Sequence, residues 1–151
     1  MVASIVVLIT LSACGIEKTK TFVGEKDDVK MEVTYTYKGD KVIKQKSVNT
    51  LKYSDFGISD DASKKLVKES IERQSEKIQD VKGVKESIKE NDEGFVETID
   101  VDFEKADIDT LKSKGIVNIA GNTGTSISMK KTEKKMKENG FKEKDCLLYT
   151  S

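Results

Sequence analysis

The segment Val29–Tyr53, VKMEVTYTYKGDKVIKQKSVNTLKY, carries the clearest structural pattern in this chain. Its first half alternates apolar residues with Lys, Glu and Thr, which is the two-residue period of a strand with one buried face. The alternating apolar residues are Val29, Met31, Val33, Tyr35 and Tyr37. Gly39-Asp40 then supplies a two-residue turn, and Val42–Tyr53 returns as the partner strand. The stretch therefore predicts an antiparallel hairpin.

The neighbouring segments extend this pattern in both directions. Upstream, Thr21–Gly24 suits a short first strand. Downstream, a helix is expected because Ser59, Asp60 and Asp61 are all able to cap a helix start, and apolar residues then recur at helical spacing. We expect its inner face to consist of Ala62, Leu66, Val67, Ile71, Gln74 and Ile78, and Gly83 to mark its end.

A second hairpin is predicted after this helix. Val84–Ile88 alternates weakly, Asn91–Gly94 makes a turn, and Phe95–Phe103 alternates again. A short helix at Asp107–Lys114 follows, stopped by Gly115.

The end of the chain predicts one more helix. Ser128 is placed to cap it, and Asn139-Gly140-Phe141 has the form of a glycine C-cap followed by a hydrophobic residue. The apolar residues between the two helices, Ile116, Val117 and Ile119, have no assigned structure. Residues 21–144 thus predict a single α+β domain: an antiparallel sheet built from two hairpins, with one longer central helix and a C-terminal helix packed on it.

Composition excludes several kinds of function. The chain has 27 basic and 27 acidic residues in 151, and this balance argues against a nucleic-acid binder, whose footprint is a basic excess. It contains no histidine, which excludes Ser-His and Cys-His catalysis and His-ligated metal sites. We therefore expect no catalytic residues, no metal site and no cofactor.

The segment Leu11-Ser12-Ala13-Cys14-Gly15 closes an apolar run from Val2 and has the form of a bacterial lipobox. The run would also suit a buried strand, but it is too short for a membrane-spanning helix of about 20 residues. We expect residues 1–13 to be a lipoprotein signal peptide, N-terminally incomplete because it opens without a positive charge. Cys14 then carries the lipid, including palmitate, and residues 14–20 form the tether. This places the protein on the extracytoplasmic face of the cell membrane.

Lipid attachment at Cys14 would leave Cys146 as the other cysteine, so a structural disulfide is not expected. Cys146 lies in a tail, residues 145–151, that fits no period and follows the glycine stop. Two explanations of this irregular tail stay open, a frayed end or sequence foreign to the natural protein.

Three stretches together resemble the YehR-like family of small bacterial lipoproteins. They are Thr34–Val42 around the Gly39-Asp40 turn, Asp102–Asp107, and the terminal helix ending Gly140-Phe141-Lys142. The resemblance implies an α+β domain on a lipid anchor, a domain of unknown function with no known enzyme activity and no established ligand. It carries over Cys14 alone as a functional residue. The uncharged start and the Cys146 tail depart from the family pattern.

Four patterns suggest sites and also have plainer explanations. Asp100-x-Asp102-x-Glu104 places alternate carboxylates as in a calcium loop, but this is also the outer face of a half-buried strand. Gly121–Thr125 superficially suggests a phosphate loop, without the lysine that such a loop requires. Tyr35 and Tyr37 could line a cleft, with core packing as the default.

The last helix has a basic face that could contact anionic lipid or wall polymers. Glu133 and Glu138 dilute its positive charge. The lysines of this face are Lys130, Lys131, Lys134, Lys135 and Lys137.

Two carboxylates fall in phase with apolar residues of their strands. Glu97 is in phase with Phe95 and Ile99, and Glu86 lies between Val84 and Ile88. A buried carboxylate with a shifted pKa is the remaining route to acid-base chemistry in a chain without histidine.

Two functional hypotheses follow from the sequence. The first is a non-catalytic envelope lipoprotein that binds another envelope protein or a wall polymer. The second is a carrier of a small ligand in a cleft between sheet and helix. A large concave pocket favours the carrier, and a flat exposed apolar patch favours the interaction module.

Overall fold

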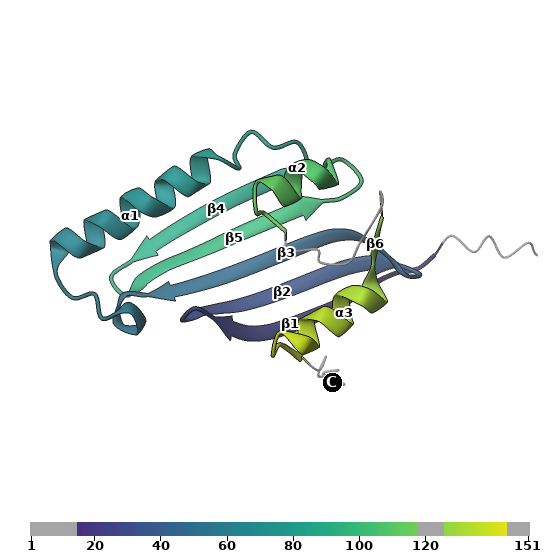
Figure 1. Ribbon diagram of the computed structural model, residues 1–151, viewed down its shortest axis with the longest axis horizontal. Helices are drawn as coiled ribbons and strands as arrows, with labels where there is room; N and C mark the ends of the chain where they lie inside the picture. The colour runs from purple at the N-terminus through teal and green to yellow at the C-terminus, as the bar shows by residue number, and fades with distance from the viewer. Residues whose placement is uncertain (1–14, 118–125, 145–151) are drawn as a thin grey trace, which may run out of the picture.

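The structure is a computed structural model that describes residues 15–117 and 126–144. These residues form a seven-stranded antiparallel sheet with helices on one of its faces (Figure 1). The strand order is β4-β5-β3-β2-β1-β7, and β6 pairs with the start of β3. The elements in chain order are β1 (Glu17–Lys26), β2 (Val29–Lys38), β3 (Lys41–Lys52), the 3-10 helix η1 (Tyr53–Phe56), α1 (Asp61–Glu76), β4 (Val84–Asn91), β5 (Gly94–Asp102), α2 (Ile108–Ser113), β6 (Ile127–Ser128), α3 (Met129–Glu138) and β7 (Lys142–Glu143).

Both predicted hairpins are present. β2 and β3 pair around the Gly39-Asp40 turn, although Tyr53 leaves the sheet and begins η1 instead of ending β3. β4 and β5 form the second hairpin, and β5 also pairs with β3, which joins the two hairpins into one sheet. The sheet is nevertheless larger than the two hairpins predict, because β1, β6 and β7 add to it.

β1 differs most from its prediction. The sequence predicts a strand only at Thr21–Gly24, but β1 runs over Glu17–Lys26 and pairs with β2 along its whole length. Residues 17–20, expected to belong to the tether, are therefore part of the domain. A polar sequence can occupy this strand because the ammonium of Lys20, on the helix-covered face, is neutralised by Glu133 of α3 at 2.7 Å.

The helix boundaries follow their capping residues. Asp60, Asp107 and Ser128 each accept a hydrogen bond from a backbone N–H in the first turn of α1, α2 and α3. At the end of α3, Gly140 adopts a φ of +84° and the N–H of Phe141 returns to a carbonyl of the helix. The predicted cap of α3 is thus confirmed, and Asp60 is selected from the three candidates at α1. Asp107, expected to be the first residue of the short helix, is instead the N-cap of α2.

α1 differs from its prediction at its end and at Leu66, whereas Val67 and Ile71 are half-buried and Ile78 is buried, as expected. α1 ends at Glu76, well before Gly83. It contacts β4 through Lys68 and Ser75, which lie two turns apart on one side of the helix. Leu66 is roughly 180° around the helix from Ser75 by the helical repeat, and its side chain is 64% exposed. The predicted inner position of Leu66 is therefore wrong, because the β4 contacts set the rotation of the helix.

α1 and α3 lie on the same face of the sheet but near opposite edges of it (Figure 1). α1 lies along β4, whereas α3 crosses β1 and β2, so the C-terminal helix packs on the sheet and away from α1. Gly24 of β1 permits the close approach of Phe141, because a Cβ at residue 24 would lie 2.7 Å from the ring. Buried side chains around Phe22, Leu111 and Met136 join α2 and α3 to the sheet in one hydrophobic core.

Several expectations concern residues outside the described ranges. They are the signal peptide 1–13, the lipid attachment at Cys14, the loop at 121–125 and the tail 145–151 with Cys146. Within residues 15–117 and 126–144, no helix combines the length and the apolar character needed to cross a bilayer.

Candidate functional site

A polar strip runs along the central strand on the helix-covered face of the sheet. Cross-strand neighbours in an antiparallel sheet point to the same face, so the register defines which side chains lie together. The three rows across β2, β3 and β5 are Tyr35-Gln45-Val101, Val33-Ser47-Ile99 and Met31-Asn49-Glu97. In each row the residue of β3 is polar, whereas the residues of β2 are apolar or aromatic.

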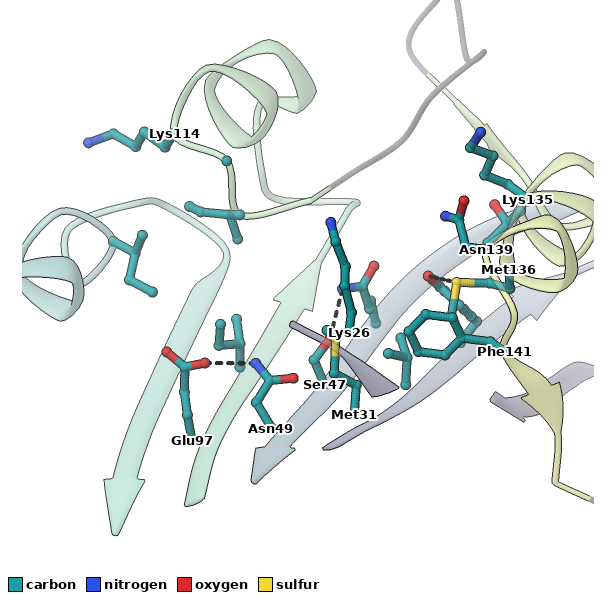
Figure 2. A pocket seen from close by; sticks show the side chains of 18 of the residues that line it. Lys26, Met31, Ser47, Asn49, Glu97, Lys114, Lys135, Met136, Asn139 and Phe141 are labelled. Atoms are coloured by element: carbon teal, nitrogen blue, oxygen red, sulfur yellow. Dashed lines mark hydrogen bonds between the residues drawn. The ribbon is translucent and has the colours of Figure 1, made fainter. Parts of the chain in front are cut away.

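A cavity of about 530 Å³ lies above this strip, and we call it the sheet cavity. Its floor is the polar strip with neighbouring side chains of β2 and β5. Figure 2 shows Glu97 and Asn49 on one side of the floor, with Met136 and Phe141 across from them. One wall consists of Gln74, Lys77, Ile78, Lys114, Gly115 and Ile116, and the other of Thr132, Lys135, Met136, Asn139 and Phe141.

The carboxyls of Glu97 and Glu86 meet at the β5 side of the floor. Glu86 pairs with Ile99, two residues beyond Glu97, so the two glutamates are diagonal neighbours on one face. Burial raises the pKa of Glu97, and the adjacent carboxyl of Glu86 raises this pKa further. The amide of Asn49 donates a hydrogen bond to Oε2 of Glu97 at 2.7 Å, and this bond lowers the pKa of Glu97. Glu97 therefore retains its proton to a higher pH than an ordinary glutamate.

Glu86 is tied to the helix layer and does not line the sheet cavity. Its Oε2 accepts a hydrogen bond from the hydroxyl of Ser75 on α1. Its Oε1 is buried and has no hydrogen-bond partner among the described residues. A proton carried by Glu97 can be donated to this oxygen, and buried acceptors normally have such a partner. Only Glu97 of the pair can reach a molecule in the cavity.

Tyr35 serves both the core and the sheet cavity. Its hydroxyl donates to the sulfur of Met136 at 3.6 Å, which links β2 to α3. Burial raises the pKa of Tyr35 to about 12, so the phenol stays protonated at physiological pH. Tyr37 is half-buried and packs against the core. The prediction that these tyrosines pack in the core is confirmed, and Tyr35 also lines the cavity.

The carboxylates of the suggested calcium pattern are engaged elsewhere. Asp102 accepts a hydrogen bond from the ammonium of Lys105 at 2.7 Å, and this bond lowers the pKa of Asp102. Asp100 is exposed, opposite Lys46 and Lys85. No three carboxylate or cysteine side chains in the described part of the chain gather closely enough to hold a metal ion.

The basic face of α3 is partly neutralised. Glu133 accepts from Lys137 at 2.6 Å and from Lys20 at 2.7 Å, and the hydrogen bond from Lys137 is the main cause of its lowered pKa. Lys135 turns toward the sheet cavity and lines it. α3 therefore presents one of its lysines to the cavity, a position that the basic helix face in the sequence does not predict.

Sequence reasoning missed the polar strip of Gln45, Ser47 and Asn49. A signal was present, because these three residues alternate with Lys44, Lys46 and Val48 in a strand without a clear apolar face. When a strand in the middle of a sheet has no apolar face, its polar residues indicate that one of its faces lines a cavity. The structure brings Glu97 next to this strip, as its phase in the sequence suggested.

The described residues form a small α+β domain, and the proteins to which it is similar are bacterial lipoproteins. A family described as "Protein of unknown function (DUF1307)" matches residues 18–142. The chain is 41% identical to an uncharacterised lipoprotein of Listeria innocua over 91% of this chain and 89% of the relative. It is 33% identical to the uncharacterised lipoprotein YehR of Escherichia coli over 95% and 93% of the two chains.

The solved structures show the same fold. The NMR structure of the E. coli YehR protein superposes with a TM-score of 0.74 at 29% identity, covering 90% of this chain and 96% of that chain. An NMR structure of a Streptococcus pneumoniae protein matches with a TM-score of 0.61 at 18% identity, over 95% and 94% of the chains. The chain belongs to the DUF1307 family and is YehR-like, as the sequence resemblance predicted.

Proposed function

We propose that this protein is a cell-envelope lipoprotein that binds a small molecule in the sheet cavity and releases it unchanged. The cavity carries the proposal. Its volume of about 530 Å³ falls within the range of about 300 to 1,000 Å³ typical of ligand sites, and it combines apolar walls with a few polar groups on the floor. The cavity favours the carrier over the interaction module. The large hydrophobic side chains exposed among the described residues, Ile16, Phe56 and Leu66, come from separate segments of the chain.

The lipid anchor at Cys14 is the second part of the proposal, and the lipoprotein relatives support it. β1 begins at Glu17, three residues after Cys14. A chain of three residues spans at most about 10 Å. The domain would therefore lie directly on the extracytoplasmic surface of the membrane, where the cavity can take up a molecule of the envelope.

The arrangement of the glutamate pair supports binding without catalysis. Two-carboxyl catalysis requires an acid and a base that both reach the substrate. Glu97 lines the cavity, but Glu86 is held by Ser75 and its second oxygen is buried. A single reachable carboxyl can orient a ligand, but it lacks the second carboxyl that such a mechanism requires.

The proposal is tested by blocking the floor of the cavity. Ser47 and Val48 are consecutive residues of β3 that point to opposite faces of the sheet. Ser47→Phe would place a ring in the cavity, whereas the matched control Val48→Phe places it on the outward face. Small molecules that shift the backbone amide NMR signals of Gln45 and Asn49 in the wild type should lose this effect in Ser47→Phe and keep it in Val48→Phe. Equal binding by the two variants would contradict the proposal, provided that both melt cooperatively.

A further inference from the structure

Lysines surround the sheet cavity at positions contributed by four different segments. Lys26 comes from the end of β1, Lys77 follows α1, Lys114 follows α2, and Lys135 lies on α3. The ammonium of Lys114 donates to the carbonyl of Lys77 at 2.8 Å and points away from the cavity in Figure 2. The side chains of Lys26 and Lys135 rise away from the sheet, toward the outer side of the cavity (Figure 2).

Three of these ammonium groups lack a close counter-ion. Lys26 and Lys77 form no ion pair with any carboxylate in the ranges 15–117 and 126–144, and Lys135 reaches Glu138 only at 4.0 Å. The carboxylate among the described cavity-lining residues is Glu97, which lies on the floor with Asn49 bound to it. The outer side of the cavity is therefore positively charged, and the negative group is confined to its depth.

The walls between the lysines and the floor are apolar. Ile78 and Ile116 face the cavity from one side, and Met136 and Phe141 face it from the other. On the floor, Gln45 donates to Ser47 at 3.0 Å and Asn49 donates to Glu97, so these donors are already engaged within the protein. A ligand can thus gain from apolar contact with the walls and from charge at the outer side.

We propose that the sheet cavity binds an amphipathic anion, with its carboxylate or phosphate group held by Lys26, Lys77 and Lys135 and its apolar body between the two walls. This inference rests on the proposed function, because it names the ligand class of the same cavity. The anionic group can belong to a free organic acid or to the headgroup of a lipid, since both present the same chemistry to the lysines.

The test uses a single tryptophan as reporter, because the chain contains none. Gln74→Trp places it at the exposed edge of the cavity wall, and Thr98→Trp on the outward face of β5 serves as the control reporter. The probes share a ten-carbon chain and differ in head group: decanoate, decyl glucoside and decyltrimethylammonium, each below its micelle concentration. Dihexanoylphosphatidylglycerol represents the lipid source of the anion.

We expect decanoate or the phosphatidylglycerol to change the fluorescence of Trp at residue 74, with a Kd about tenfold or more below that of decyltrimethylammonium. Replacing Lys26, Lys77 and Lys135 by Gln should weaken anion binding about tenfold, because each exposed ion pair contributes about a factor of two. The control replaces Lys46, Lys85 and Lys89 on the outward face, which removes the same net charge and should leave Kd within about twofold.

Each remaining outcome decides against one of the two claims or both. Equal binding of all three head groups in the cavity would overturn the charge inference and leave the cavity as a binding site. Loss of affinity in both lysine triples would overturn it as well, because net charge and not position would be the cause. The proposed function would be overturned too if no probe bound and if Ser47→Phe left the binding of every tested small molecule unchanged. The anion that binds more tightly, decanoate or the phosphatidylglycerol, identifies whether the ligand is a free organic acid or a lipid.

Discussion

The substitution Glu97→Gln removes the carboxyl on the floor of the cavity, which lies next to the carboxyl of Glu86. Burial raises the pKa of Glu97 in the folded protein, with a further contribution from Glu86. A group whose folded pKa is raised favours folding most at low pH, and this contribution is lost as the pH rises through the folded pKa. At neutral pH the wild-type protein therefore loses folding free energy at Glu97, whereas a glutamine at this position does not titrate. We expect Glu97→Gln to be more stable than wild type above the folded pKa of Glu97.

The free-energy penalty that ionised Glu97 imposes on the folded protein has an upper limit, because Glu97 can keep its proton instead of ionising. The ordinary pKa of glutamate is 4.5, which is about 2.5 pH units below pH 7, and each pH unit corresponds to about 1.36 kcal/mol. Keeping the proton therefore costs at most about 3.4 kcal/mol. Glu97 lines an open cavity, so we expect solvent screening to leave about 1 to 2 kcal/mol. Gln can also donate to the unpaired Oε1 of Glu86.

The assay is thermal unfolding of wild type and variant at pH 7.5 and at pH 4. At pH 7.5 the variant should melt about 3 to 8 °C higher. At pH 4 the difference should largely disappear, because the raised pKa of Glu97 keeps this carboxyl protonated there. Glu25→Gln is the matched control, since it removes the same charge from an exposed position on β1. A variant that is less stable at pH 7.5, or equally shifted at both pH values, would refute the reasoning about the pair.

Three further predictions concern the anchor and the contacts of α3. Cys14→Ala should release the protein from membranes, because two acyl chains give stable attachment; quantitative retention after a high-salt wash would contradict lipidation. Gly24→Ala should destabilise the domain by about 1 to 3 kcal/mol in denaturant titrations, since the new Cβ would lie 2.7 Å from the ring of Phe141. Adding Phe141→Leu should recover part of this loss, and strict additivity would refute the clash. Glu133→Gln should cost about 1 kcal/mol at pH 7. Hydrogen bonds from Lys137 and Lys20 lower the pKa of Glu133, so its contribution is present above pH 4.5 and lost as the pH falls through the folded pKa. An equal loss at pH 3 would show that packing, and not charge, is responsible.

Local chemistry explains which elements could be predicted. The hairpin at Val29–Tyr53 has alternating apolar residues on one side of a glycine turn, and the caps at Asp60 and Ser128 are hydrogen bonds over three residues. Such features depend on neighbours in the sequence, so their prediction was confirmed. β1 was largely missed because its polar residues are stabilised by β2 and by Glu133, both distant in the sequence.

The antiparallel hairpins, the helix starts, the lack of histidine chemistry and the likeness to YehR-like lipoproteins follow from the amino-acid sequence alone. It also placed Glu97 in phase with buried residues. Only the tertiary structure decided that Glu97 meets Glu86, that Leu66 faces solvent, and that α1 and α3 lie apart over the sheet and leave a cavity between them. The physical reason is that a strand's period fixes the face on which a side chain lies, whereas what covers that face depends on long-range packing.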